Sequence, residues 1–130
     1  MLGTPQYLAP EVVVGDEFDG YGPKVDIWGL GISCVEMADG LPLFHDLKPM
    51  EVLQQLANDD LTVTLKSASS FSPAFNDFVK ACTRVLPAER MSSSECCMHA
   101  FLATAHPKLV LRGFEDVIEH AKRRGTADDG

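Results

Sequence analysis

The sequence predicts a mainly α-helical domain. Residues 24–39 are apolar on almost every side of a helix, and two later stretches place apolar residues at i, i+3, i+4 and i+7. Only residues 61–65 alternate in the way a strand does. Hydrophobic residues make up 45% of the 130 residues and charged residues 23%, which is typical of a globular protein with a core. One helical domain without a substantial sheet therefore follows.

Charge and cysteine content exclude several classes of function. The formal net charge is −8, which argues against general affinity for nucleic acid or for an anionic membrane. No apolar run approaches the roughly 20 residues of a membrane span, and residues 1–6 lack the features of a secretory signal. Four Cys do not form a disulfide framework, so we expect a reducing compartment, the cytoplasm.

The first half of the chain predicts loop, helix, loop and helix. Residues 1–23 are rich in Gly and Pro and predict an ordered loop with a short helix at 9–14. Residues 24–39 predict a helix surrounded by protein, which ends at the C-cap signal Asp39-Gly40. We expect another backbone to approach Gly29 and Gly31, because glycine otherwise destabilises a helix interior.

The second half predicts further helices, each with a recognisable start. Pro49 occupies the first position of one helix, and Ser72 with Pro73 begins another. Ser92 and Glu95 form a capping box. A last helix follows from four apolar residues at helical spacing with basic residues in its final turn. The four apolar residues are Phe114, Val117, Ile118 and Ala121.

Three segments carry information about function. Residues 3–11 read Gly-Thr-Pro-Gln-Tyr-Leu-Ala-Pro-Glu, and residues 26–31 read Asp-Ile-Trp-Gly-Leu-Gly. Residues 86–90 read Leu-Pro-Ala-Glu-Arg and are followed at 99–102 by His-Ala-Phe-Leu. In this order and spacing they resemble the C-terminal lobe of a eukaryotic protein kinase, from the end of the activation segment through the buried central helix to the last lobe helix.

The finer resemblance is to serine/threonine kinases of the sterile-twenty-like group, especially its germinal-centre branch. Residues 35–42 and 48–50 carry it. The resemblance implies a mainly α fold, the helical C-terminal lobe fragment of a protein-kinase-like fold. It also implies three parts along the chain. These are a partial kinase domain at 1–104, a C-terminal helical extension at 105–124 and a polar tail at 125–130.

The resemblance implies a parent protein of signal transduction that phosphorylates Ser and Thr of protein substrates with ATP and Mg²⁺. In this family the residues for ATP, metal and catalysis lie N-terminal to Ala-Pro-Glu. We therefore expect the chain alone to be inactive, with no catalytic, cofactor-binding or metal-binding residue. Its partners would be protein substrates, regulatory proteins and the N-terminal kinase portion, with neither nucleic acid nor membrane. A non-catalytic kinase-like interaction module, docking partners around the helix at Pro49, is the alternative.

The resemblance also assigns roles to residues of this sequence. A substrate-binding loop would comprise Thr4, Pro5, Gln6, Tyr7 and Leu8. Glu11 and Arg90 would form a structural ion pair that ties the activation segment to the end of the lobe. Asp26 and Trp28 would support the catalytic loop, although Asp26 also suits the start of a helix and Trp28 suits a core.

Two further expectations concern packing. Cys96, Cys97 and His99 suggest metal ligands, but adjacent Cys on a helix diverge and zinc requires four converging ligands. We interpret these Cys as buried thiols. The helix at 24–39 should expose a large apolar patch where the preceding parts of a kinase would cover it.

Overall fold

The computed structural model describes residues 5–15, 22–103 and 107–127. Every regular element in these ranges is helical, so the predicted mainly α fold is confirmed. The packing divides the chain into one unit of residues 1–99 and another of residues 100–130. No helix in the described ranges is long and apolar enough to cross a membrane.

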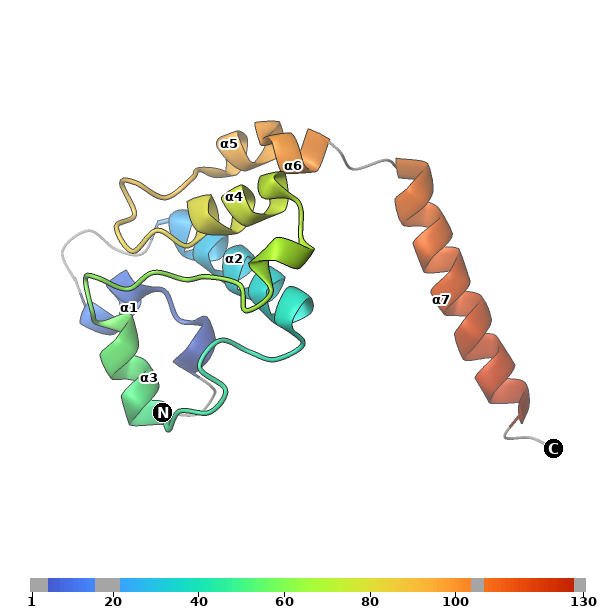
Figure 1. Ribbon diagram of the computed structural model, residues 1–130, viewed down its shortest axis with the longest axis horizontal. Coiled ribbons are helices and arrows are strands. Elements are labelled where there is room, and N and C mark those ends of the chain that lie inside the picture. Colours follow the sequence, from blue (N-terminus) through green and yellow to red (C-terminus); the bar gives the residue numbers. More distant parts are fainter. Residues whose placement is uncertain (1–4, 16–21, 104–106, 128–130) are drawn as a thin grey trace. The chain divides into compact units, whose positions relative to one another are not determined.

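Seven of the elements lie in the first unit (Figure 1). They are η1 (Pro5–Tyr7), α1 (Pro10–Val14), α2 (Lys24–Asp39), α3 (Pro49–Leu56), η2 (Ala68–Ser70), α4 (Pro73–Cys82) and α5 (Ser93–Met98). The second unit contains α6 (Ala100–Ala103) and α7 (Pro107–Ala127).

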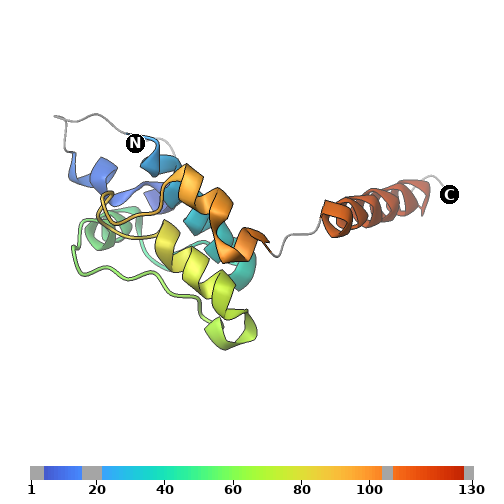
Figure 2. The same cartoon turned by 90° about the horizontal axis from the view of Figure 1, so that it is seen from above.

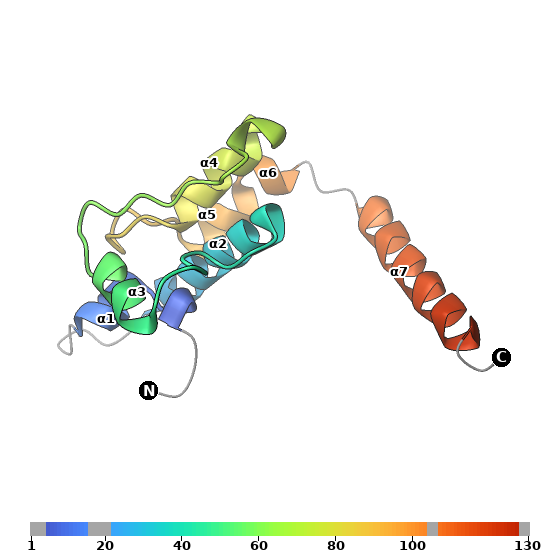
Figure 3. The ribbon, with the colours of Figure 1, turned by 60° about the horizontal axis from the view of Figure 1, so that its bottom comes forward.

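Helix α2 is the centre of the first unit. Its buried residues include Ile27, Trp28, Ile32, Cys34 and Val35. Helix α4 packs along α2, while η1 contacts both α2 and α3 (Figure 2). Helix α1 packs against α3, which also contacts η1 (Figure 3). The C-cap of α2 is Gly40, whose φ of 76° favours glycine, as the sequence predicts.

The sequence predicts a large exposed apolar patch on α2, but the exposed apolar surface of this helix is small. The exposed row of the helix contains Asp26, Leu30, Ser33 and Met37 at helical spacing. Leu30 is 41% exposed and Met37 is 76% exposed, but the polar Ser33 lies between them. Helix α4, η1 and loop residues contact other sides of α2, and its exposed row is a narrow stripe of mixed polarity.

The two glycines of α2 behave differently. A Cβ at Gly31 would lie 2.6 Å from Cγ2 of Thr83 and 2.8 Å from Cβ of Cys82, so glycine permits the close packing of α2 on the end of α4. A Cβ at Gly29 would meet no atom within 4 Å. The expected close approach is confirmed at Gly31 and wrong at Gly29.

Helix starts follow the predicted chemistry. Ser72 Oγ accepts a hydrogen bond from the Phe75 amide at 3.1 Å, and Ser92 Oγ accepts from the Glu95 amide at 3.2 Å. The Glu95 carboxylate accepts from the Ser92 amide at 3.4 Å, which completes the capping box.

The predicted extended segment 61–65 alternates in burial. Val63 and Leu65 are 4% and 7% exposed, whereas Thr62 and Thr64 face solvent. The alternation therefore places the two apolar side chains in the core without a β-sheet in the described part of the chain.

One thiol assignment needs correction. Cys34, Cys82 and Cys96 are buried, but Cys97 is exposed. Cys96 and Cys97 are adjacent on α5, so they point about 100° apart and only one of them reaches the core.

Candidate functional site

The segment expected to bind substrate is a tight turn followed by a short helix. The amide of Leu8 donates to the carbonyl of Pro5 at 3.1 Å, which closes η1. Pro5 and Ala9 are buried, and Pro10 occupies the first turn of α1. Of the predicted loop, Thr4 lies outside the described residues. The other four residues lie in or directly after η1, which packs on α2 and α3.

Tyr7 connects this loop to α2. Its hydroxyl donates a hydrogen bond to the carboxylate of Glu36. This bond raises the pKa of Tyr7 above its ordinary value, and partial burial and the charge of Glu36 act in the same direction. Gln6 Oε1 is buried and has no hydrogen-bond partner among the described residues. The loop is thus held by the hydrogen bond between Tyr7 and Glu36 as well as by the turn that closes η1.

Glu11 and Arg90 lie in direct contact. The two terminal nitrogens of Arg90 donate to the two carboxylate oxygens of Glu11 at 2.7 and 2.9 Å, which makes the pair bidentate. The Arg90 side chain is 0% exposed and the Glu11 side chain 18% exposed. The structure therefore joins α1, which follows the segment expected to bind substrate, to a residue 79 positions away.

Arg90 uses all five of its N–H groups. Beyond the two bonds to Glu11, Nη1 donates to the Lys24 carbonyl at 2.8 Å. Nε donates to the Arg84 carbonyl at 2.9 Å, and Nη2 donates to the Val85 carbonyl at 3.1 Å. Because every donor has an acceptor, the buried guanidinium is fully compensated. It joins α1, the start of α2 and the loop after α4.

The side chain of Lys24, whose carbonyl accepts from Arg90, also reinforces this junction. Lys24 Nζ donates to the carbonyl of Pro87 at 2.8 Å. Residues 84–87 are thereby held to the first turn of α2 by Lys24 and Arg90 together.

Trp28 and Asp26 have different environments. The Trp28 ring is 0% exposed and lies under the guanidinium carbon of Arg90, 5.3 Å from the ring centre. Asp26 is exposed in the first turn of α2, where a carboxylate suits the helix dipole. Trp28 is thus part of the core and of the Arg90 site, whereas Asp26 lies apart from it.

The pKa of Glu11 is lowered by its surroundings. Burial alone would raise the pKa of this carboxyl group. The hydrogen bonds from Arg90, a backbone hydrogen bond and the Arg90 charge outweigh burial. Glu11 is therefore ionised over the neutral range, where its carboxylate pairs with the Arg90 cation.

A largely apolar hollow lies beside the loop. It is lined by Leu8, two residues of α1, two of α3 and the residue that follows α3, and has a volume of about 610 Å³. These residues are Val12 and Val13 of α1, Leu53 and Gln54 of α3, and Ala57. The hollow belongs to the region around the Pro49 helix that the sequence suggests as a docking face.

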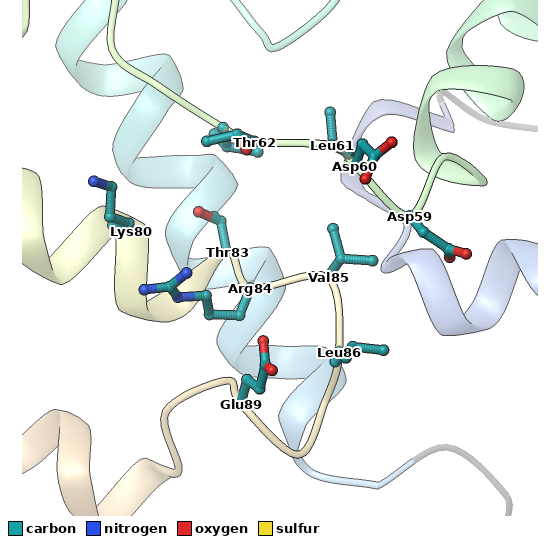
Figure 4. A pocket seen from close by; sticks show the side chains of 11 residues that line it. Asp59, Asp60, Leu61, Thr62, Lys80, Thr83, Arg84, Val85, Leu86 and Glu89 are labelled. Carbon is teal, nitrogen blue, oxygen red and sulfur yellow. The ribbon is translucent and has the colours of Figure 1, made fainter.

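A polar hollow lies between residues 59–63 and the loop after α4 (Figure 4). Its volume is about 310 Å³. Lys80 and Arg84 line it together with three acidic residues, Asp59, Asp60 and Glu89. Because residues of both charge signs line this hollow, its charge favours neither an anion nor a cation. None of the predicted site residues lines it.

Among the described residues, no three His, Cys, Asp or Glu side chains gather in a way that could hold a metal ion.

Two contributors to the site were missed by sequence reasoning. Glu36 and Lys24 lie on α2, and each contacts a segment distant in the chain. Their signal was weak because both look like solvent-facing charges on a helix. The signal that could have identified them is their charge on α2, the helix that lies between the motif segments 3–11 and 86–90 in the sequence.

Comparison with known proteins identifies the family. Residues 1–102 match the family model described as protein kinase domain. Since this covers most of the chain, the protein belongs to the protein kinase family.

Its relatives are serine/threonine-protein kinases. The chain is 36% identical to serine/threonine-protein kinase dst1 of Dictyostelium discoideum, over 93% of this chain and 16% of that protein. It is 40% identical to serine/threonine-protein kinase ste20 of Aspergillus fumigatus, over 82% and 13%. It is 38% identical to serine/threonine-protein kinase cst-1 of Caenorhabditis elegans, over 81% and 20%. The chain thus spans between 13% and 20% of the length of these relatives.

Proposed function

We propose that the parent protein is a serine/threonine kinase and that these residues form its substrate-binding edge. The parent would transfer the γ-phosphoryl group of ATP to Ser or Thr of protein substrates. The observation that supports this role most is the Glu11–Arg90 ion pair, which fastens the segment after η1 to the lobe. A loop that receives a substrate must keep its shape, and the ion pair supplies that rigidity.

The loop has two further supports in this proposal. Tyr7 is bonded to Glu36, and Pro5 is buried against the helices below. Substrate backbone would lie along Gln6, Tyr7 and Leu8. Glu11, Arg90 and Trp28 act as positioning residues, because Arg90 packs on Trp28 and holds Glu11 in the helix that directly follows the loop.

The chain alone does not catalyse phosphoryl transfer in this proposal, because ATP and Mg²⁺ would be held by other parts of a kinase. Purified chain is to be incubated with radiolabelled ATP, Mg²⁺ and a generic Ser/Thr substrate protein. We expect no labelled product and no saturable binding of Mg²⁺-ATP. Measurable transfer or binding would contradict the proposed division of roles.

The substrate-edge role has its own test. A peptide carrying a photoreactive group after its Ser should crosslink to residues 5–8 in the wild-type chain. The Glu11→Gln variant should give less crosslink at the same residues, whereas Glu89→Gln, an exposed carboxylate outside the ion pair, should match the wild type. Equal crosslinking in all three proteins would count against the role of the ion pair.

A non-catalytic interaction module is the second candidate, and the apolar hollow between α1 and α3 favours it. In that case an apolar side chain of a partner would occupy the hollow. The N-terminal kinase portion of the proposed parent protein separates the two candidates. Intact catalytic Lys, His-Arg-Asp and Asp-Phe-Gly codons favour the enzyme, and substituted codons favour the module.

A further inference from the structure

Helix α7 carries an apolar stripe that the proposed function does not use. By helical spacing Ile118 and Ala121 share one side of the helix, with Val117 at its border. Val117 is 67% exposed and Ile118 is 52% exposed. All the described side chains of residues 115–125 are exposed in the second unit.

The charges of α7 are segregated over residues 115–124. Lys108 and Arg112 lie earlier in the helix, and in this later segment acidic residues come first and basic residues follow within two turns. The acidic set is Glu115, Asp116 and Glu119, and the basic set is Lys122, Arg123 and Arg124. Glu119 and Arg123 form an ion pair within this segment at 3.7 Å, and both side chains are strongly exposed.

We propose that α7 pairs with α7 of a second copy of the chain, in antiparallel orientation. A two-fold axis between positions 119 and 120 places Ile118 opposite Ala121 of the partner subunit, and the reverse. Glu115 then faces the partner subunit's Lys122, and the same contact recurs on the other side of the axis. Residues 115–124 are therefore complementary to the same segment of a second copy, both in the positions of their apolar side chains and in their charges.

Charge complementarity selects this occupant and this orientation. A parallel pair in register would set acidic residues beside acidic residues and basic beside basic, which is unfavourable. The antiparallel pair sets the acidic segment of one copy against the basic segment of the other. Glu115 and Lys122 flank the stripe on the same side, which is the position of the charges that decide partner orientation in paired helices.

The pairing is expected to be reversible, because the apolar surface is short. A helix of 21 residues is about 31 Å long. Sedimentation velocity of the whole 130-residue chain, run up to about 0.5 mM, detects a dimer whose dissociation constant is about 0.1 mM. We expect a monomer–dimer equilibrium that shifts with concentration and weakens with salt.

Charge-exchange variants give the sharpest test. Glu115→Lys and Lys122→Glu each turn two attractive contacts into two repulsive ones, so each variant alone should dimerise about tenfold more weakly. An equimolar mixture of the two should restore the dimer, because each cross-contact then joins opposite charges. Asp116→Asn, on the opposite side of the helix, is the control and should behave like the wild type.

Ile118→Asp should abolish the dimer while circular dichroism reports unchanged helix content. The proposal is overturned if the wild type stays monomeric over the whole concentration range or if the mixture stays monomeric. It is also overturned if α7 packs on the first unit of its own chain, in which case the two variants do not recognise each other.

Discussion

The guanidinium carbon of Arg90 lies 5.3 Å from the centre of the Trp28 ring, and solvent reaches neither side chain. The arginine is thus placed between an aromatic face and the carboxylate of Glu11. A cation in such a site is stabilised by the ring and by its hydrogen bonds together. The first turn of α2 therefore depends on a residue of the loop before α5.

Removing this cation should be costly. Arg90→Met leaves Glu11 without its partner and three backbone carbonyls without their donor. We expect the free energy of unfolding to fall by about 3–5 kcal/mol. Urea unfolding followed by fluorescence of Trp28, the only tryptophan, measures the change.

Arg84→Met is the matched control for this substitution. The Arg84 side chain is exposed, and its carbonyl, which accepts from Arg90, is kept. We expect a change of at most about 0.5 kcal/mol. Equal loss of stability in the two variants would show that Arg90 has no special role.

Stability should fall in acid through Glu11. Its pKa in the folded state is below the ordinary value of 4.5, because the bonds and charge of Arg90 outweigh burial. The stabilisation is therefore present above about pH 4.5 and is lost as the pH falls through the folded-state pKa. The unfolding free energies of wild type and Glu11→Gln, measured from pH 7 to pH 3, should converge at the acid end. A constant difference across this range would contradict the assignment.

The glycines of α2 should respond in opposite directions to alanine. Gly31→Ala should destabilise the chain by about 1–3 kcal/mol, because its Cβ overlaps Thr83 and Cys82. Gly29→Ala should be neutral or stabilising by up to about 1 kcal/mol, since it has room for a methyl group and gains helix propensity. Thermal melts of the two variants measure both changes in stability. A Gly29→Ala variant less stable than Gly31→Ala would be inconsistent with the packing of α2 on α4.

The thiols should differ in reactivity. Burial raises the pKa of Cys34, Cys82 and Cys96, whereas Cys97 is exposed. A thiol-specific dye should label one cysteine quickly in the native protein and all four in denaturant. Cys97→Ser should remove the fast phase, and a fast phase that survives this substitution would show that a core thiol is open.

Much of the fold could be predicted because local chemistry specifies it. The ends of α2 and the starts of α4 and α5 follow from Gly40, Ser72 and Ser92, whose roles depend only on neighbouring residues. The exposed row of α2 could not be predicted in this way. Its polarity depends on which side α4 covers, and that is a tertiary choice.

The predicted site residues were found from motifs, and the structure shows what the motifs leave out. It brings Glu11, Arg90 and Trp28 together and leaves Asp26 in solvent. The carbonyl acceptors of Arg90 carry no side-chain signal, so no sequence pattern reports them. Cys97 was misassigned because hydrophobic residue types alone do not tell which side of a short helix faces the core.

The central claim is that Glu11 and Arg90 act as one unit that fastens α1, next to the proposed substrate loop, to the rest of the helical lobe. A double-mutant cycle with Glu11→Gln and Arg90→Met, followed by urea unfolding, measures their coupling directly. We expect the effects to be strongly non-additive, with a coupling of about 1.5–3 kcal/mol. Effects that add to within about 0.5 kcal/mol would contradict the claim.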